Sequence, residues 1–366
     1  MLFSLKSTAT GRSALFLVLA TALSSPWSAS AANPNTVTVM TRNLDAGTDM
    51  NYILAATDQT SFVMGAAATL AEVKASRIPE RAARIAEEIA AYKPDLIALQ
   101  EVTLWRTGPL MQPPATVVLY DQLDLLMAEL AKRNLHYAIA AVQSQFDAEA
   151  PVPTEGIDLR ITDRDVILAR IDLPQSQFDV SNAQTHRYQA VFKFGSPVLG
   201  EIQVPRGWMA VDVEVQKSKF RLVNTHLEST YPGLPAGETV QQAQVEELLA
   251  ALASPGMPVI LAGDFNANAE PGPEQTGAVR AIRSAHFADS WKSAKLVDPG
   301  YTWPLFGEDQ ASGPASPNER IDLIFTGGDI QLSFWGDPNV VSVERTGTAA
   351  PWASDHAGVV VKVRLK

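Results

Sequence analysis

Several apolar runs of this chain end in a polar residue whose side chain can bind a metal ion or move a proton. An apolar run that ends in Asn, Glu, His or Asp is typical of a buried strand that delivers one polar side chain to its exposed end. Such endings, when several occur in one chain, predict one shared site. They are TRNLD at 41–45, LIALQEV at 96–102, NTHLES at 224–229, LAGDFNAN at 261–268, RIDLIF at 320–325 and SDH at 354–356.

Oxygen donors dominate these endings, and two imidazoles, His226 and His356, accompany them. Hard divalent cations prefer oxygen ligands. A bound cation can neutralise phosphoryl oxygens while neighbouring side chains move protons. The set therefore favours a metal-dependent reaction on a phosphoester.

Asp264 and Asn266 flank Phe265 directly after an apolar strand. In extended backbone an i,i+2 pair points both side chains to the same side. The carboxylate could then take a proton from water while the amide holds the water or a phosphate oxygen. A plain Asx turn is the alternative for this pair.

The two imidazoles could face one phosphoryl group and donate hydrogen bonds to its non-bridging oxygens. Each needs a partner that fixes its tautomer and keeps it cationic. For His226 the candidates are Asp163 and Asp165 in TDRDVILAR, and their spacing does not choose between them. No role is assigned to the remaining histidines, which are His136, His186 and His286.

Other polar residues near the motifs have two open interpretations. On local grounds Asn43 is a turn former, because Asp45 and Gly47 follow it. Asn224 and Arg320 could steady neighbouring strand ends or contact phosphate. The tryptophans close to the motifs could line an apolar or base-stacking wall or pack in the core. They are Trp105, Trp303 and Trp352.

The order and wording of the motifs resemble the endonuclease/exonuclease/phosphatase superfamily. The resemblance spans Val37 to the C-terminus, and its most specific part is GDFNAN followed by RIDLIF and then SDH. It implies a metal-dependent phosphoester hydrolase with a deoxyribonuclease I-like α/β fold. That fold is a four-layer sandwich of two packed mixed β-sheets flanked by helices. The resemblance does not name the substrate.

The resemblance also implies a metal site. Glu101 is its principal ligand, and Mg²⁺ or Mn²⁺ is the implied cofactor. Asn43, read by the family pattern rather than locally, assists through its neutral amide. Asp355 is expected to contribute directly or through water, whereas Asp45 remains a turn residue.

The catalytic set implied by the resemblance consists of Asp264, Asn266, His226, His356 and Asp322. Asp264 activates water, Asn266 supports it, and Asp322 partners His356. Water attacks phosphorus directly, and no covalent enzyme intermediate is expected. The division of the general-base role between Asp264 and His356 stays open.

The N-terminus is typical of a secretory signal peptide. Lys6 and Arg12 precede the apolar stretch 14–23, and small residues follow at 28–32. We expect residues 1–32 to be removed and 33–366 to form one catalytic domain. No later segment resembles a transmembrane helix, so we expect a periplasmic or secreted protein. The chain has no Cys, and its stability must therefore come from core burial.

Charge bears on the substrate. Loss of Lys6 and Arg12 changes the net charge from −11 to about −13. Such a surface repels polyanions at long range, whereas a nonspecific nuclease benefits from a basic face. A small or lipid-borne phosphoester is therefore favoured over nucleic acid. The alternatives are an extracellular or periplasmic nuclease and, from another class, a catalytically inactive binding module. The oligomeric state stays open.

The elements that must position these residues begin with a βαβ-like unit. We predict a strand at 37–42, an amphipathic helix at 80–92 and a strand at 96–99, which places Asn43 and Glu101 at neighbouring strand ends. Residues 103–118 and 143–164 are predicted to be long loops that carry specificity. Further strands are predicted at 137–142, 165–170, 189–194, 208–215, 220–225, 258–262, 320–326, 330–335 and 357–365, and further helices at about 119–133, 238–252 and 274–285.

Overall fold

A computed structural model describes residues 36–48, 50–229, 236–253, 257–270, 276–294, 296–305, 317–327, 340–348 and 352–365. The chain divides into two units, Met1–Asn33 and Pro34–Lys366, and the described residues belong to the second. The predicted signal peptide at 1–32 and the predicted strand at 330–335 lie outside the described residues.

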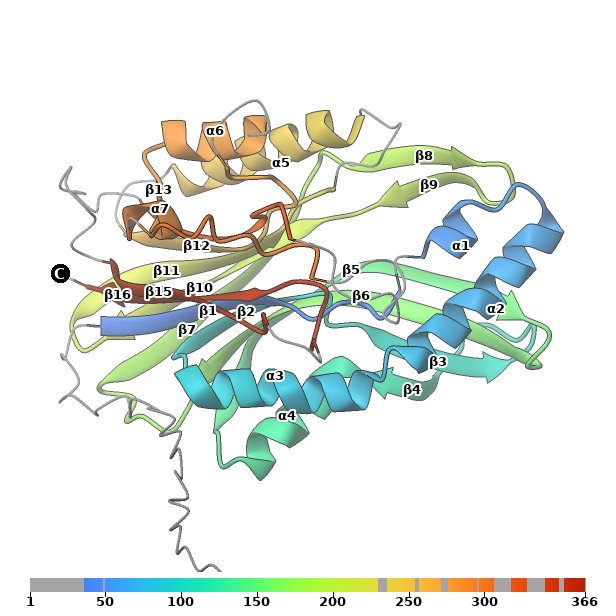
Figure 1. Cartoon of the computed structure of the whole chain (residues 1–366), viewed down its shortest axis with the longest axis horizontal. Helices are drawn as coiled ribbons and strands as arrows, with labels where there is room; N and C mark the ends of the chain where they lie inside the picture. Colours follow the sequence, from blue (N-terminus) through green and yellow to red (C-terminus); the bar gives the residue numbers. More distant parts are fainter. Residues whose placement is uncertain are drawn as a thin grey trace, which may run out of the picture. The chain divides into compact units, whose positions relative to one another are not determined.

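Two mixed β-sheets form the body of the second unit (Figure 1). Sheet A contains, in order, β15 (Val340–Thr346), β16 (Gly358–Arg364), β1 (Thr36–Asn43), β2 (Leu96–Gln100), β6 (Ile157–Arg170), β3 (Leu104–Pro109) and β4 (Val117–Asp121), and β5 (Tyr137–Val152) pairs with β6. Sheet B contains β13 (Ala288–Asp289), β14 (Asp322–Gly327), β12 (Val259–Asp264), β11 (Ser218–His226), β10 (Gly207–Val215) and β7 (Phe178–Arg187). A separate hairpin joins β8 (Phe192–Ser196) to β9 (Gly200–Val204).

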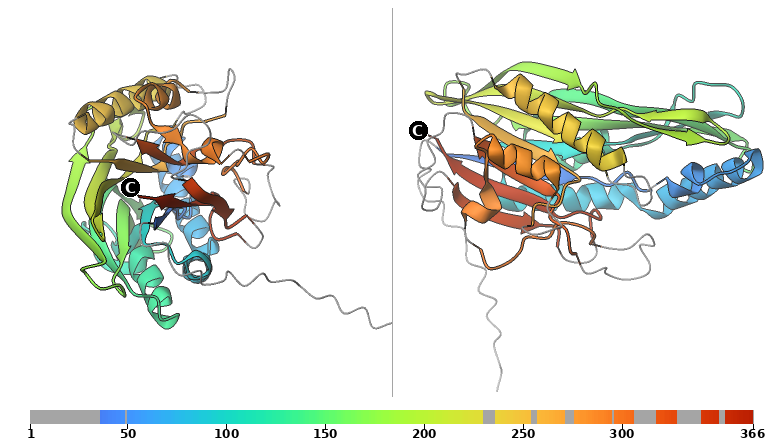
Figure 2. Two further views of the ribbon diagram at one scale, coloured as in Figure 1. Left: turned by 90° about the vertical axis from the view of Figure 1, so that its left-hand side faces the viewer. Right: turned by 90° about the horizontal axis from the view of Figure 1, so that it is seen from above.

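Helices cover the outer face of each sheet. On sheet A lie α3 (Ile78–Tyr92) and α4 (Gln122–Lys132), and on sheet B lie α5 (Ala236–Leu252) and α6 (Gly277–Ser284). Figure 2 shows these two helix pairs on opposite sides of the paired sheets. The predicted four-layer α/β sandwich is therefore confirmed. The remaining described helices are α1 (Asn51–Leu54), α2 (Gln59–Ala75) and α7 (Ser290–Ser293).

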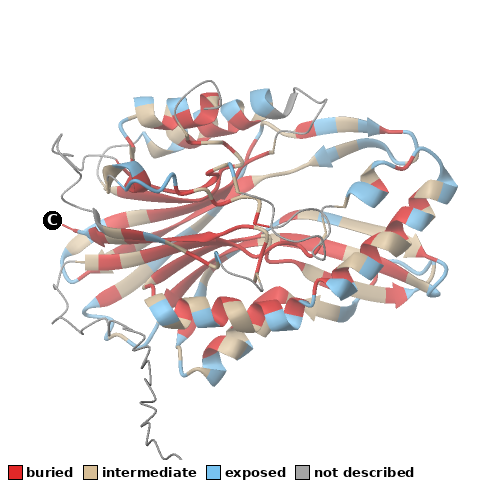
Figure 3. Cartoon of the chain, viewed as in Figure 1, coloured by how far each residue is buried: buried red, intermediate tan, exposed pale blue. Residues whose placement is uncertain are grey.

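Strand β2 illustrates how the layers are built. All its residues are buried. Because side chains alternate along a strand, Leu96 and Ala98 point toward sheet B, whereas Ile97 and Leu99 point toward α3 and α4. Each buried aliphatic side chain contributes roughly 1.5–3 kcal/mol to folding. Figure 3 shows that the strands at the centre are largely buried and that the outward faces of the helices are exposed.

The prediction of two long loops at 103–118 and 143–164 is wrong. Residues 103–118 contain β3 and the start of β4, and 143–164 lie mostly within β5 and β6. Their charged residues conceal a period of two, in which Leu159 and Ile161 are buried and Arg160 between them is paired with Asp147. Helix α2, which was not predicted, packs on this part of sheet A together with Trp105. Strands β7, β9 and β15 were also not predicted, and the strand expected at 189–194 occupies 192–196.

Strand register brings the motif residues to one end of the sandwich. In sheet A, β1 and β2 are parallel, with Asn43 opposite Gln100. In sheet B, β11 and β12 are parallel, with His226 opposite Asp264. Parallel strands end at the same edge of their sheet, so both pairs of polar residues lie at strand ends. Among the described residues, no helix is long and apolar enough to cross a membrane.

Candidate active site

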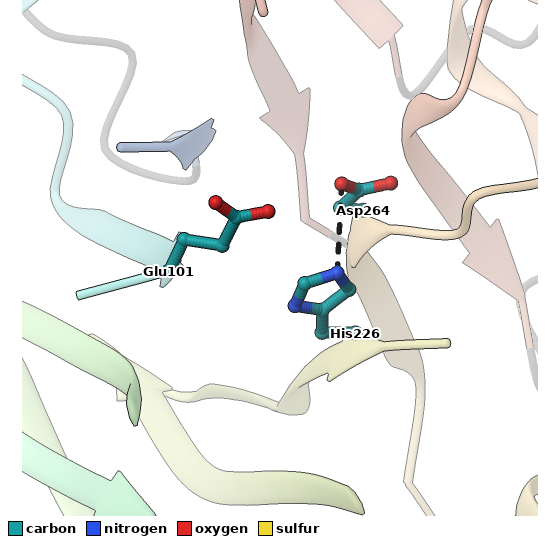
Figure 4. A group of neighbouring side chains, drawn as sticks. All are labelled: Glu101, His226 and Asp264. Atoms are coloured by element: carbon teal, nitrogen blue, oxygen red, sulfur yellow. Dashed lines mark ion pairs between the residues drawn. The ribbon is translucent and has the colours of Figure 1, made fainter. Parts of the chain in front are cut away.

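Asp264 lies at the centre of the motif residues. Its Oδ2 accepts a hydrogen bond of 2.9 Å from Asn43 Nδ2, which also donates to Glu101 Oε1 at 3.0 Å. His226 Nε2 lies 3.7 Å from the same Oδ2. Figure 4 shows Glu101, His226 and Asp264 pointing toward one another from different strand ends. His356 Nδ1 lies 3.8 Å from Asp264 Oδ2, so the structure brings together residues from five of the sequence motifs.

Glu101 directly follows β2 with a positive φ of 53°. Its carboxylate is half-buried, and Oε2 accepts a hydrogen bond of 2.8 Å from the backbone N–H of Ala46. Burial raises the pKa of the Glu101 carboxyl above its ordinary value, against the opposing effect of His226. The local fold thus holds a carboxylate in a partly desolvated place where a cation would stabilise its charge.

The turn after Asp264 differs from the extended backbone that the sequence suggested. Asn266 has a positive φ of 47°, so the strand ends at Asp264. Asp264 Oδ1 accepts a hydrogen bond of 2.8 Å from the backbone N–H of Asn266, which is the Asx turn considered as the alternative. Asn266 Nδ2 donates to the carbonyl of Leu227 at 3.0 Å. The turn fixes the rotamer of Asp264 while its Oδ2 faces the site.

Gly263 allows the close approach that this geometry needs. A Cβ atom at this position would lie 1.9 Å from the carbonyl oxygen of Thr225 on the neighbouring strand. A side chain here would therefore push β12 away from β11 and separate Asp264 from His226.

His356 is oriented by a buried carboxylate. Its Nδ1 lies 2.9 Å from Asp322 Oδ2. Burial alone would lower the pKa of His356, but Asp322, Asp355 and Asp264 hold it well above its ordinary value. The structure thus pairs the two residues that the resemblance pairs and gives a cationic imidazole. Their catalytic roles stay predictions.

His226 has different surroundings. Asp165 Oδ1 is 3.7 Å from its Nδ1, so of the two candidate partners Asp165 is the one in reach. Arg206 Nη1 lies 3.1 Å from both ring nitrogens. Burial and the charge of Arg206 lower the pKa of His226 to about 4. The expectation that a carboxylate keeps this imidazole cationic is therefore wrong.

Arg206 is a site residue that the sequence did not reveal. It lies between β9 and β10, outside every motif, and its Nη2 is 3.6 Å from Glu228 Oε1. A single arginine in a short connection gives no periodic or motif signal. Only the tertiary fold places its guanidinium beside His226.

Asp355 lies at the edge of the site. It is half-buried, and its Oδ2 accepts a hydrogen bond of 3.3 Å from Trp303 Nε1. Burial raises the pKa of Asp355 to about 7, and Asp45 and Glu101 add repulsion. Two sets of described side chains converge closely enough to hold a metal ion, Glu101 with His226 and Asp264, and Asp264 with Asp322 and His356. Asp355 is in neither set, so its role as a ligand stays a prediction.

The open alternatives for two polar residues are decided by their contacts. Asn224 Nδ2 donates to the carbonyls of Leu99 and Val166, both at 3.0 Å, and thereby ties sheet B to sheet A. Arg320 pairs with Asp289 at 2.6 Å and with Glu270 at 2.9 Å. Both residues steady strand ends.

The tryptophans and Asp45 also have settled environments. Trp105 is buried and donates from Nε1 to the carbonyl of Ala46 at 2.9 Å. Trp303 is half-buried, and its ring centroid is 6.4 Å from that of His356. Trp352 is half-buried. Asp45 Oδ1 accepts from the N–H of Gly47 at 2.6 Å, which confirms its assignment as a turn residue.

The donor set fits a hard divalent cation. Asn43 Nδ2 donates to the carboxylates of both Glu101 and Asp264, and Asn43 Oδ1 accepts from the backbone N–H of Asp45, so the amide orients two carboxylates that meet at one place. Magnesium is commonly held by one or two carboxylates together with waters and substrate oxygens. Glu101 is therefore the residue that would hold the ion, and Asn43 links its carboxylate to Asp264.

Comparison with known proteins places this geometry in a family. The model of the endonuclease/exonuclease/phosphatase family matches residues 64–356. A search of curated proteins found no match. Among solved structures, the endonuclease/exonuclease/phosphatase from Beutenbergia cavernae is 23% identical with a TM-score of 0.55, covering 90% of this chain and 72% of that chain.

Two further structures have a similar fold. The family protein from Leptotrichia buccalis is 15% identical with a TM-score of 0.52, covering 90% of this chain and 99% of that chain. The endonuclease/exonuclease/phosphatase from Bacteroides vulgatus is 18% identical with a TM-score of 0.52, covering 91% of this chain and 100% of that chain. These likenesses show the fold alone, whereas the family model spans most of the chain. This protein therefore belongs to the endonuclease/exonuclease/phosphatase family.

Proposed function

We propose that this protein is an exported phosphoester hydrolase that depends on Mg²⁺ or Mn²⁺ and uses direct attack by water. One observation carries the proposal. Asp264 Oδ2 lies between a prospective metal site at Asn43 and Glu101 and two imidazoles, His226 at 3.7 Å and His356 at 3.8 Å. Family membership supports the reaction class.

In this mechanism Asp264 takes the proton of the attacking water. Its Oδ1 is held by the Asn266 N–H, so Oδ2 is aimed at the reacting atoms. Asn266 positions this carboxylate through its backbone. A divalent cation at Glu101 would supply charge neutralisation of the phosphoryl and leaving oxygens.

The cationic His356 donates a hydrogen bond from Nε2 to a non-bridging oxygen, because Asp322 occupies Nδ1. His226, with a low pKa, acts as a neutral donor or acceptor beside it.

The proposed substrate is a small or lipid-borne phosphoester, with a nuclease as the alternative. The mature net charge of about −13, reached from −11 by loss of Lys6 and Arg12, supports the first. The half-buried Trp303 beside His356 supports the nuclease alternative, because an aromatic ring can stack on a nucleic-acid base. Export is proposed from the leader-like residues 1–32.

A metal-supplemented activity screen tests the proposal. Mature protein would be offered plasmid DNA, RNA, sphingomyelin, inositol phosphates and a generic phosphodiester with Mg²⁺ and with Mn²⁺. Release of phosphate or an alcohol from at least one substrate is expected, and the Asp264→Asn variant should lose it. Absence of turnover on every substrate would favour an inactive binding module.

A further inference from the structure

Buried acceptor oxygens without a hydrogen-bond partner gather on two neighbouring strands of sheet A. Within the described part of the chain they are Gln143 Oε1, Gln145 Oε1, Asp163 Oδ1 and Asp165 Oδ1. All four side chains are more than nine-tenths buried, with exposures of 8%, 3%, 8% and 1%. A buried polar atom that lacks a partner is costly, so such a concentration calls for a ligand or a proton.

The strand register places these side chains on one face. Asp163 and Asp165 are two residues apart on β6, and Gln143 on β5 is the register partner of Asp165. Gln145 Nε2 donates to Asp165 Oδ2 at 2.6 Å. Gln143 Nε2 donates to the carbonyl of His186 in sheet B at 3.0 Å. These bonds fix both amides, so their oxygens cannot exchange places with their nitrogens without losing a bond.

This face of sheet A points toward sheet B, next to His226 of the candidate active site. Asp165 Oδ1 lies 3.7 Å from His226 Nδ1. The charge of Arg206, whose Nη2 also lies 3.6 Å from Glu228 Oε1, acts on both Asp163 and Asp165. Burial raises the pKa of both carboxyls to about 7, and Asp165 adds to the shift of Asp163. Arg206 opposes part of this shift, and one guanidinium is thus shared by the carboxylates of Asp163, Asp165 and Glu228.

We propose that Gln143, Gln145, Asp163 and Asp165 form a second cation site, which neighbours but does not include Glu101, and that it binds a hard divalent cation of the Ca²⁺ class. Two carboxylates and two amide oxygens are hard ligands, and Ca²⁺ accepts a mixed, irregular set of them. Mg²⁺ fits less well, because it demands near-ideal octahedral geometry. The ion would join β5 and β6 to the His226 end of sheet B.

Calcium binding to chelated full-length protein tests this site. The Glu101→Gln background is used so that the site at Glu101 is weakened and hydrolysis is not needed as a readout. Titration calorimetry and native mass spectrometry with CaCl₂ should find one bound Ca²⁺ per chain, together with a rise in Tm. Adding Asp163→Asn should abolish both effects.

Two further variants control the experiment. Asp158→Asn removes a buried carboxylate from the same strand whose Oδ2 accepts from the Gln112 N–H, and it should leave Ca²⁺ binding unchanged. Gln145→Met keeps the charge, and it should weaken binding at least tenfold even if Asp163→Asn fails to fold.

Two results would overturn the second site. One is no Ca²⁺ bound to the Glu101→Gln protein, which would mean that water or a proton satisfies the four oxygens. The other is unchanged binding in both Asp163→Asn and Gln145→Met. Either result leaves the proposed hydrolase intact, because the Glu101 site is tested separately by turnover.

Discussion

Asp322 Oδ2 lies 2.9 Å from His356 Nδ1, and both side chains are buried. They reach each other from strand β14 and from the turn before β16, which belong to different sheets. The carboxylate fixes one ring nitrogen and leaves Nε2 for the substrate. The pair therefore joins the two sheets and sets the charge of the site.

The pairing of Asp322 with His356 predicts how substitutions of the two residues affect kcat. Asp322→Asn and His356→Ala should each lower kcat by roughly 10²–10⁴-fold, the range typical of positioned proton-transfer groups. The double variant should be little worse than His356→Ala, because the residues act as a unit. Steady-state kinetics on the best substrate checks this, and multiplicative losses would mean that the two act independently.

Arg206 should control the protonation of His226. Burial and the guanidinium lower the pKa of this imidazole to about 4, so removing the guanidinium in Arg206→Met should raise the pKa toward its ordinary value of 6.5. An NMR titration of the metal-free protein measures the shift directly. Arg187→Met, in the neighbouring strand β7, is the matched control and should leave the titration of His226 unchanged. A pKa of His226 that stays the same in Arg206→Met would contradict the role of Arg206.

The buried pair of Arg320 and Asp289 should stabilise the fold without taking part in the reaction. Arg320→Leu leaves Asp289 buried beside fewer cations, and breaking such a pair costs about 3–5 kcal/mol. Burial alone would raise the pKa of Asp289, but Arg320 and Arg283 hold it below its ordinary value.

A depressed pKa gives this pair a defined pH dependence. Its stabilisation is fully present above the unfolded-state pKa of Asp, about 3.9, and is lost as pH falls through the lower folded value. Urea unfolding at pH 7 and in acid measures it. A loss in Arg320→Leu that is as large in strong acid as at pH 7 would show that the charge of Asp289 is not the cause.

The substrate class can be separated by salt. If a small or lipid-borne phosphoester is the substrate, its kcat/KM should exceed that for plasmid DNA and change only modestly with NaCl, because few phosphates are contacted. A salt series with both substrates measures this. A clear preference for DNA that collapses steeply with salt would favour the nuclease.

The positions of site residues could be predicted from the sequence where a motif ends a buried strand. Glu101 and Asp264 follow apolar runs, and Asn43 and His226 end strands in which apolar residues recur. These strands must be buried, so the positions of the four residues at strand ends could be predicted. The pairing of His356 with Asp322 came from the family pattern, because no local signal joins residues that far apart.

Strands that contain many charged residues could not be predicted from the sequence. In β6 the buried Leu159 and Ile161 alternate with charged residues such as Arg160. The partners of Arg160 and Arg164 are Asp147 and Asp121, which belong to other strands. Such ion pairs form only once the strands meet. Arg206 was missed for the same reason, since its place beside His226 depends on the docking of β10 against β11.

Metal dependence tests the central claim most directly. Chelated protein would be assayed on its best substrate with and without added Mg²⁺, beside Glu101→Gln and the control Glu214→Gln, whose carboxylate is exposed and paired with Lys219. We expect Mg²⁺ to restore the activity of the wild type and of Glu214→Gln. The activity of Glu101→Gln should stay at least 100-fold lower, roughly the loss expected for one key transition-state contact, while its Tm is unchanged. Equal turnover by the chelated and the Mg²⁺-supplemented protein would contradict it.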